Sequence, residues 1–192
     1  MSAGQQSNPA SGPGLSREQI LGALQNLSDQ LGRQGVTGEI CLFGGTVMVL
    51  AFTARLTTKV VDGIFQPAQD IRQLARRIAD DLHLPADWLN DSVKGFVSTR
   101  HETTTGNLPQ FPHLRLTMPV PEYLLAMKCM AARVGGRTDE PSDVADIVFL
   151  VRHLNLKSAK EVLDLVGQYY PANRIPVKTE HWVESLFEER KR

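Results

Sequence analysis

The most constraining feature of this sequence is a short apolar run at residues 39–43 (EICLF) that stops at the pair Gly44-Gly45. An apolar run of this length that ends at glycine is typical of a buried strand. The residues at 46–55 fit strand or helix by composition, but their position directly after a Gly-Gly turn favours a helix. The β-branched stretch at 57–65 (TTKVVDGIF) then predicts a second strand. The expected order is therefore strand, turn, helix and strand.

The Gly-Gly turn has the chemistry of half a triphosphate site. Glycine lets backbone N–H groups approach a phosphate because no Cβ stands in the way. A helix that begins at Thr46 would add its N-terminal partial positive charge and its unpaired amides. The Thr46 hydroxyl could donate one more hydrogen bond. We therefore expect Gly44, Gly45 and Thr46 to contact phosphate oxygens.

The second strand carries the other half of such a site. Residues i and i+2 of a strand point to the same face, about 6.5–7 Å apart along the chain. Two carboxylates placed in this way can share Mg²⁺ ions that lie about 3.5–4 Å apart in two-metal phosphoryl chemistry. Here the two positions hold Val60 and Asp62. Only Asp62 can be a metal ligand, because the valine side chain has no donor atom.

The rest of the chain predicts an α+β fold with a helical C-terminal half. Ser16 and Gln19 form a capping box, and apolar residues then recur at helical spacing as far as the glycines at 32–35. Pro67 begins an amphipathic helix. Further expected elements are a helical turn at 85–91, a polar loop at 100–112, a strand at 114–118, and helices at 121–133, 141–154, 158–169 and 179–189. These elements divide the chain into a disordered tail at 1–14, a core at 15–120 and a helical region at 121–192 that packs on the core.

Five segments, in this order, resemble the DNA polymerase β-like nucleotidyltransferase superfamily. More narrowly, they resemble the AbiEii-type toxins of type IV toxin–antitoxin systems and related bacterial proteins. The segments are FGGT at 43–46, TKVVDGIF at 58–65, WLND at 88–91, PEYLLAMK at 121–128 and SDVADIVFL at 142–150. The ordered set is more specific than the Gly-Gly pair or the single aspartate alone, and the resemblance spans roughly residues 15–190. It implies a nucleotidyltransferase core with a small mixed sheet.

The resemblance also implies an activity and its partners. A protein of this superfamily would move a nucleotide from an NTP to a hydroxyl group, with Mg²⁺ or Mn²⁺ as the metal. The acceptor would be an RNA 3′ end, as in members that modify tRNA, or a protein side chain. A cognate antitoxin would be a further partner.

Carried over by position, the first metal-binding acid of the family falls on Val60, and Asp62 matches the second. The resemblance implies that Lys128 contacts the nucleotide phosphates and that Arg133 points toward the same rim. One of Asp143 and Asp146, which share a helix face, would hold the lysine or the substrate, and Asp143 is favoured. The candidate catalytic residues are thus Asp62, Lys128, Asp143 and Asp146, and the candidate nucleotide-binding residues are Gly44, Gly45, Thr46, Lys128 and Arg133.

Val60 leaves three explanations open. The protein is a natural pseudoenzyme, it carries an inactivating substitution, or another acid occupies the position in space. The alternative function is a nucleotide-binding or toxin–antitoxin partner module without catalysis, and a third is a helical scaffold in which Gly44-Gly45 is only a turn. Lys128 could also extend to solvent, and Asp143 could serve only the start of its helix.

Composition narrows the setting of the protein. The net charge is zero, so any polyanion must be held by a local cluster of cations. Cys41 and Cys129 lie in apolar runs, which predicts buried thiols in a reducing compartment. The N-terminus lacks the pattern of a signal peptide, and no apolar run reaches the about 18 residues of a membrane span. We expect a cytosolic protein with no membrane partner.

Overall fold

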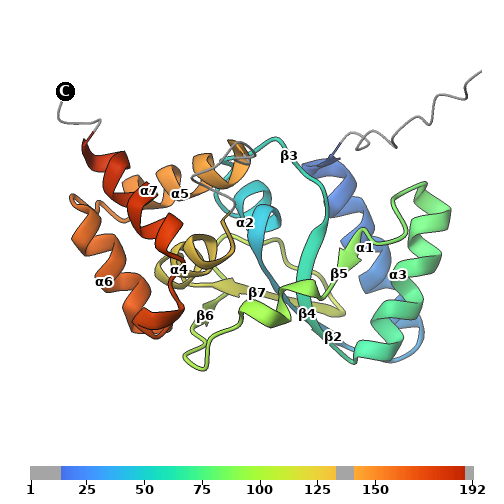
Figure 1. Cartoon of the computed structure of the whole chain (residues 1–192). Coiled ribbons are helices and arrows are strands. Elements are labelled where there is room, and N and C mark those ends of the chain that lie inside the picture. The colour runs from blue at the N-terminus through green and yellow to red at the C-terminus, as the bar shows by residue number, and fades with distance from the viewer. Residues whose placement is uncertain (1–13, 133–140, 189–192) are drawn as a thin grey trace, which may run out of the picture.

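The computed structural model of the chain describes residues 14–132 and 141–188. Its centre is a five-stranded mixed sheet with the strand order β5-β4-β2-β7-β6 (Figure 1). The strands are β2 (Gly38–Leu42), β4 (Val61–Gln66), β5 (Leu89–Asn90), β6 (Thr103–Thr104) and β7 (Leu114–Pro119). The central strand β2 pairs antiparallel with β4 and parallel with β7. A separate pair joins β1 (Leu15–Ser16) to β3 (Thr57–Thr58).

Seven α-helices surround this sheet within the described part of the chain. They are α1 (Arg17–Arg33), α2 (Gly44–Leu50), α3 (Ala68–Leu82), α4 (Pro121–Ala131), α5 (Pro141–His153), α6 (Ala159–Tyr169) and α7 (Val177–Glu188). Helices α1 and α3 pack on each other and on the sheet, whereas α4 contacts β7 and supports α5 and α6 (Figure 1). The fold is therefore α+β with a mixed sheet, as the sequence predicts.

The helices form for identifiable local reasons. The Ser16 hydroxyl accepts from the Gln19 backbone N–H and the Gln19 side chain accepts from the Ser16 backbone N–H, so the predicted capping box begins α1. Helix α3 buries one face, and Trp88 donates from its indole to the Ala75 carbonyl at 2.9 Å. Helix α4 is mostly apolar, and its residues from Tyr123 to Cys129 are buried, Lys128 included. One hydrophobic cluster runs from Leu15 to Phe187, so the C-terminal helices share the core of the sheet.

Apart from the helix expected at 46–55, which begins at Gly44 and ends at Leu50, three predicted elements differ in the structure. The single strand expected at 57–65 is interrupted, because Lys59 and Val60 lie outside β3 and β4. The expected helical turn at 85–91 is a hydrogen-bonded turn followed by β5, which pairs in parallel with β4. The polar loop at 100–112 contains the short strand β6, because Thr103 and Thr104 pair with the end of β7. Each difference comes from a pairing with a distant segment.

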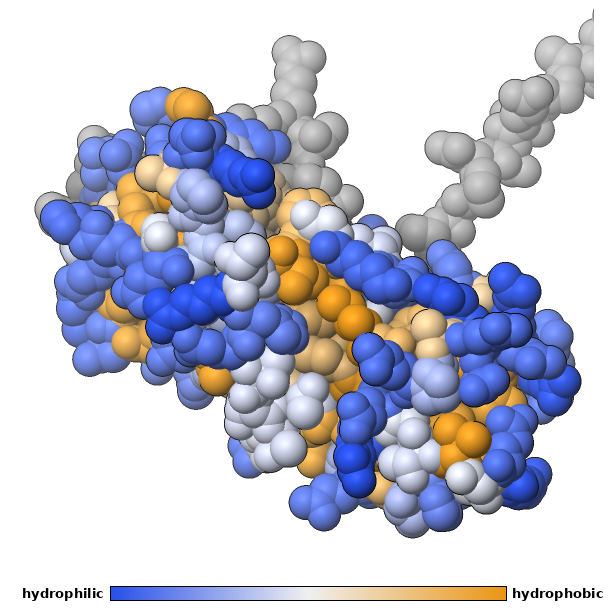
Figure 2. All heavy atoms as spheres, turned by 90° about the horizontal axis from the view of Figure 1, so that it is seen from below, coloured by the Kyte–Doolittle hydropathy of each residue, from blue (hydrophilic) through white to orange (hydrophobic). Residues whose placement is uncertain are grey.

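Polar and apolar residues are unevenly distributed over the surface. Viewed from below, polar residues cover most of both ends of the molecule, and apolar surface gathers along the middle of the face (Figure 2). Among the helices formed by residues 14–132 and 141–188, none has the length and apolar character needed to cross a membrane.

Of the two cysteines, Cys129 is buried and Cys41 is half-buried, and both are free thiols. Burial raises the pKa of the Cys129 thiol to about 12.

Candidate functional site

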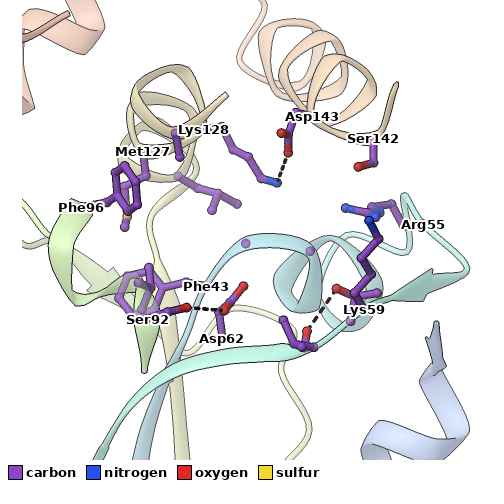
Figure 3. Close-up of a pocket in the computed structure, with 17 residues that line it drawn as sticks. Phe43, Arg55, Lys59, Asp62, Ser92, Phe96, Met127, Lys128, Ser142 and Asp143 are labelled. Carbon is purple, nitrogen blue, oxygen red and sulfur yellow. Dashed lines mark hydrogen bonds and ion pairs between the residues drawn. The ribbon is translucent and has the colours of Figure 1, made fainter. Parts of the chain in front are cut away.

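Five of the predicted site residues, Gly44, Gly45, Asp62, Lys128 and Asp143, line one cavity of about 360 Å³. Its lower side in Figure 3 is formed by the Gly44-Gly45 turn and β4, and we call this side the strand wall. Its upper side is formed by α4 and α5, with Lys128 and Asp143, and we call this side the helix wall. The two walls come from segments that are far apart in the sequence.

The strand wall depends on both glycines. Gly44 has a φ of 59°, which is left-handed backbone that favours glycine, and a Cβ there would lie 3.1 Å from Asp62 Oδ2. At Gly45 a Cβ would lie 2.5 Å from Thr58 Oγ1 and 3.0 Å from an Arg55 guanidinium nitrogen. The Gly-Gly pair therefore allows helix α2 to begin directly against Arg55 and against Thr58 of β3.

Asp62 faces the cavity from β4. Its backbone carbonyl accepts from the Phe43 N–H at 2.9 Å, which joins the start of α2 to the strand. Its side chain accepts from the Ser92 hydroxyl at 3.5 Å, and Asn90 is its partner across the β4–β5 pair. Burial raises the pKa of the Asp62 carboxyl above its ordinary value, and the charge of Lys128 and hydrogen bonds from Ser92 and Asn90 oppose this shift.

Val60 lies directly before β4 and also lines the cavity. Its carbonyl oxygen accepts from the Thr58 hydroxyl at 3.1 Å and from the Thr46 hydroxyl at 3.2 Å. This corrects the expectation for Thr46. Thr46 is the third residue of α2 rather than the first, and it is fully buried. Its hydroxyl donates to the Val60 carbonyl and does not line the cavity.

The helix wall is a network of paired charges. Lys128, which is 9% exposed, places its Nζ 2.5 Å from Asp146 Oδ2 and 3.7 Å from Asp143 Oδ1. Arg55, from the loop after α2, reaches the same Asp146 oxygen at 3.2 Å. The nearer partner of the lysine is thus Asp146, not the favoured Asp143. Asp146 lies behind the lysine on the buried face of α5, whereas Asp143 lines the cavity itself.

Asp146 links two segments that are far apart in the sequence. Its side chain is 1% exposed, and one of its oxygens accepts from Lys128 of α4 and from Arg55 of the loop after α2. Its other oxygen, Oδ1, is buried and has no hydrogen-bond partner among the described residues. A buried charge is costly unless it is paired. The shared carboxylate of Asp146 therefore holds the Lys128 and Arg55 side chains close to each other.

Several cavity residues were not predicted from the sequence. Arg55 and Lys59 add two cations to Lys128, and Phe96 adds an aromatic ring, from η1 (Ser92–Phe96), a 3₁₀ turn. Two basic residues four positions apart, directly before the strand with the acid, are the signal that could have indicated the cations. No local pattern indicates Phe96. Arg133, predicted at the rim, lies outside the described residues.

The donor set does not fit a pair of metal ions. A two-metal site needs carboxylates shared between both ions. Asp62 and Asp143 are the acids that line the cavity among the described residues, and Figure 3 shows them on opposite walls. The Val60 carbonyl oxygen already accepts hydrogen bonds from two hydroxyl groups, those of Thr46 and Thr58. In addition, residues 14–132 and 141–188 contain no group of three His, Cys, Asp or Glu that could hold an ion.

Comparison with known proteins adds no relative. No family model, no curated protein and no solved structure matches this chain. The residues that line the cavity are therefore what indicates a function.

Proposed function

We propose that the cavity binds a nucleoside triphosphate and that the chain is a nucleotidyltransferase-like protein lacking one metal-binding carboxylate at Val60. The observation that carries this proposal is the convergence of Gly44, Asp62 and Lys128 on one cavity. These residues come from α2, β4 and α4, so chance adjacency in sequence does not explain their meeting. An incidental Gly-Gly turn in a helical scaffold would not require it.

The cations supply the chemistry for phosphate binding. Arg55, Lys59 and Lys128 line the cavity together with the Gly44-Gly45 backbone. Arginine has five N–H donors and lysine three, so both can contact phosphate oxygens while they contact Asp146. In a chain of zero net charge, this local cluster provides the attraction for a polyanion.

The reaction class follows from the resemblance. A nucleotidyltransferase joins the nucleotide of an NTP to an acceptor hydroxyl and releases pyrophosphate. Such transfer depends on positioning and on neutralisation of phosphate charge more than on covalent work by the protein. The implied acceptors are an RNA 3′ end and a protein hydroxyl. With Val60 in place, the cavity supplies the positioning cations without the second carboxylate.

The test compares the protein with Val60→Asp. Each protein is incubated with each of four radiolabelled NTPs, Mg²⁺ and total tRNA, and label is followed on RNA and on protein bands. We expect transfer by Val60→Asp at a rate at least about tenfold above the unchanged chain, since losing one key catalytic interaction commonly costs a factor of 10²–10³. Val60→Asp combined with Asp62→Asn is the matched control and should be inactive. If neither protein transfers label and neither binds NTP, the proposal is wrong.

Val60 specifically favours a second candidate, a nucleotide-binding partner module that has lost transfer. This candidate predicts NTP binding with weak metal dependence and a stable complex with a protein encoded beside it. Co-purification with the product of an adjacent gene would test it. Transfer by the unchanged chain would contradict it.

A further inference from the structure

The cavity has two chemically different ends. Arg55 and Lys59 lie at one side of Figure 3, Phe96 and Met127 lie at the other, and Asp62 and Lys128 lie between them. The cavity lining also includes apolar side chains from η1 and α4, namely Val93, Leu124 and Ala131. A cavity that is cationic at one end and apolar at the other matches a ligand with a polyanionic end and a flat apolar end.

Phe96 is an unusual apolar residue in this protein. It is 43% exposed, and it is the aromatic residue among the exposed large hydrophobics of the described chain. Exposure of a large ring costs free energy that burial against a ligand would recover. Two other exposed large hydrophobic residues, Leu56 and Leu82, do not line the cavity.

The backbone that carries Phe96 is held in place. The Tyr170 hydroxyl donates to the Phe96 carbonyl at 2.5 Å. Two residues on, the Ser98 N–H donates to the Tyr123 hydroxyl at 2.8 Å, and the Ser98 hydroxyl donates to the Tyr169 carbonyl at 2.5 Å. These bonds tie the segment to α4 and to the end of α6. The ring is therefore exposed on a fixed support, as a preorganised binding surface is.

We propose that Phe96 and the apolar end of the cavity bind the base of the nucleoside triphosphate, by stacking and apolar contact. This inference rests on the proposed function and adds how the base is selected. The side chains of Phe96 and Met127 have no N–H or O–H donor, and the hydroxyl labelled on that side of Figure 3, that of Ser92, is engaged with Asn90 and Asp62. The base is thus recognised by its flat surface rather than by its hydrogen-bonding edge, which favours purines over pyrimidines and distinguishes adenine from guanine weakly.

The test measures binding of ATP and of inorganic tripolyphosphate by calorimetry, in EDTA, for the unchanged protein and for Phe96→Ala. Base stacking on an aromatic ring contributes about 1–3 kcal/mol by alanine substitution, so Phe96→Ala should weaken ATP binding about tenfold or more. Tripolyphosphate binding should not change. Phe96→Tyr should restore ATP binding, and Leu82→Ala, a truncation at a residue of matched exposure (42%), should leave both ligands unaffected.

The outcomes separate the two proposals. If tripolyphosphate binds but ATP binds no more tightly, or if Phe96→Ala weakens both ligands equally, the base site is wrong and the phosphate site remains. If neither ligand binds the unchanged protein, the proposed function fails as well. GTP should bind within about threefold of ATP, and a difference above about tenfold, or 1.4 kcal/mol, would show that polar groups read the base and would overturn the inference.

Discussion

The two walls of the cavity hold their charges in opposite ways. On the helix wall, Lys128 lies against Asp146, and the same carboxylate accepts from Arg55, so buried charges compensate one another. On the strand wall, Asp62 is desolvated, and its support from Ser92, Asn90 and Lys128 does not outweigh burial. The cations of the helix wall are paired without a ligand, whereas the strand wall has one acid where the resemblance predicts two. Removing a carboxylate should therefore have opposite effects on the two walls.

The largest effect should come from the helix wall. Asp146→Asn leaves Lys128 and Arg55 without their shared charge, and removing one partner of a buried pair typically costs about 3–5 kcal/mol of stability. Urea unfolding at pH 7 should show a lower midpoint with an unchanged slope. Asp164→Asn, which removes an exposed partner of Lys160, is the control and should change stability by about 1 kcal/mol or less. Equal effects of the two substitutions would contradict the account of the helix wall.

The strand wall should be sensitive to volume instead. Gly45→Ala places a Cβ 2.5 Å from Thr58 Oγ1, and overpacking of this kind costs about 1–3 kcal/mol. Gly22→Ala in α1 is the matched control, because a Cβ there meets nothing within 4 Å. Since alanine favours a helix over glycine, Gly22→Ala should stabilise by up to about 1 kcal/mol. Thermal unfolding of both variants should give shifts of opposite sign.

The smallest effect should come from the strand-wall carboxylate. Because the folded-state pKa of Asp62 is raised, its ionisation destabilises the folded protein as the pH rises through that pKa. Asp62→Asn should therefore be slightly more stable than the unchanged chain at pH 7. The difference in stability between Asp62→Asn and the unchanged chain should shrink as the pH falls toward 3.8, the ordinary pKa of an aspartate. The Asp62 carboxyl of the folded protein is then mostly protonated and carries no more charge than asparagine. A destabilised Asp62→Asn at pH 7 would show that its hydrogen bonds and Lys128 outweigh burial.

Local patterns predicted most of the fold. The capping box at Ser16, the strand before Gly44-Gly45 and the four C-terminal helices lie where the sequence places them. The patterns failed where distant segments decide the structure. Strand β5 forms because Leu89 and Asn90 pair with β4. The residues around Leu89 do not indicate by themselves which distant strand they pair with.

The site was predictable to a similar extent. Gly45, Asp62 and Lys128, which the motifs predicted as site residues, line one cavity. Arg55 could not be placed, because its partner Asp146 lies 91 residues away in the chain. The prediction for Thr46 was wrong because α2 begins at Gly44 and not at Thr46. The Thr46 hydroxyl, predicted to contact phosphate, is buried and donates to the Val60 carbonyl.

The most direct test of the central claim is the Mg²⁺ dependence of ATP binding, measured by calorimetry for the unchanged chain and for Val60→Asp. The account predicts that the unchanged chain binds ATP through its cations with similar affinity in Mg²⁺ and in EDTA. Val60→Asp should bind ATP about tenfold or more tightly in Mg²⁺ than in EDTA, because a second carboxylate beside Asp62 supplies the missing metal ligand. If the unchanged chain already shows the full dependence on Mg²⁺, no metal ligand is missing at Val60, and if neither protein binds ATP, the cavity is not a nucleotide site.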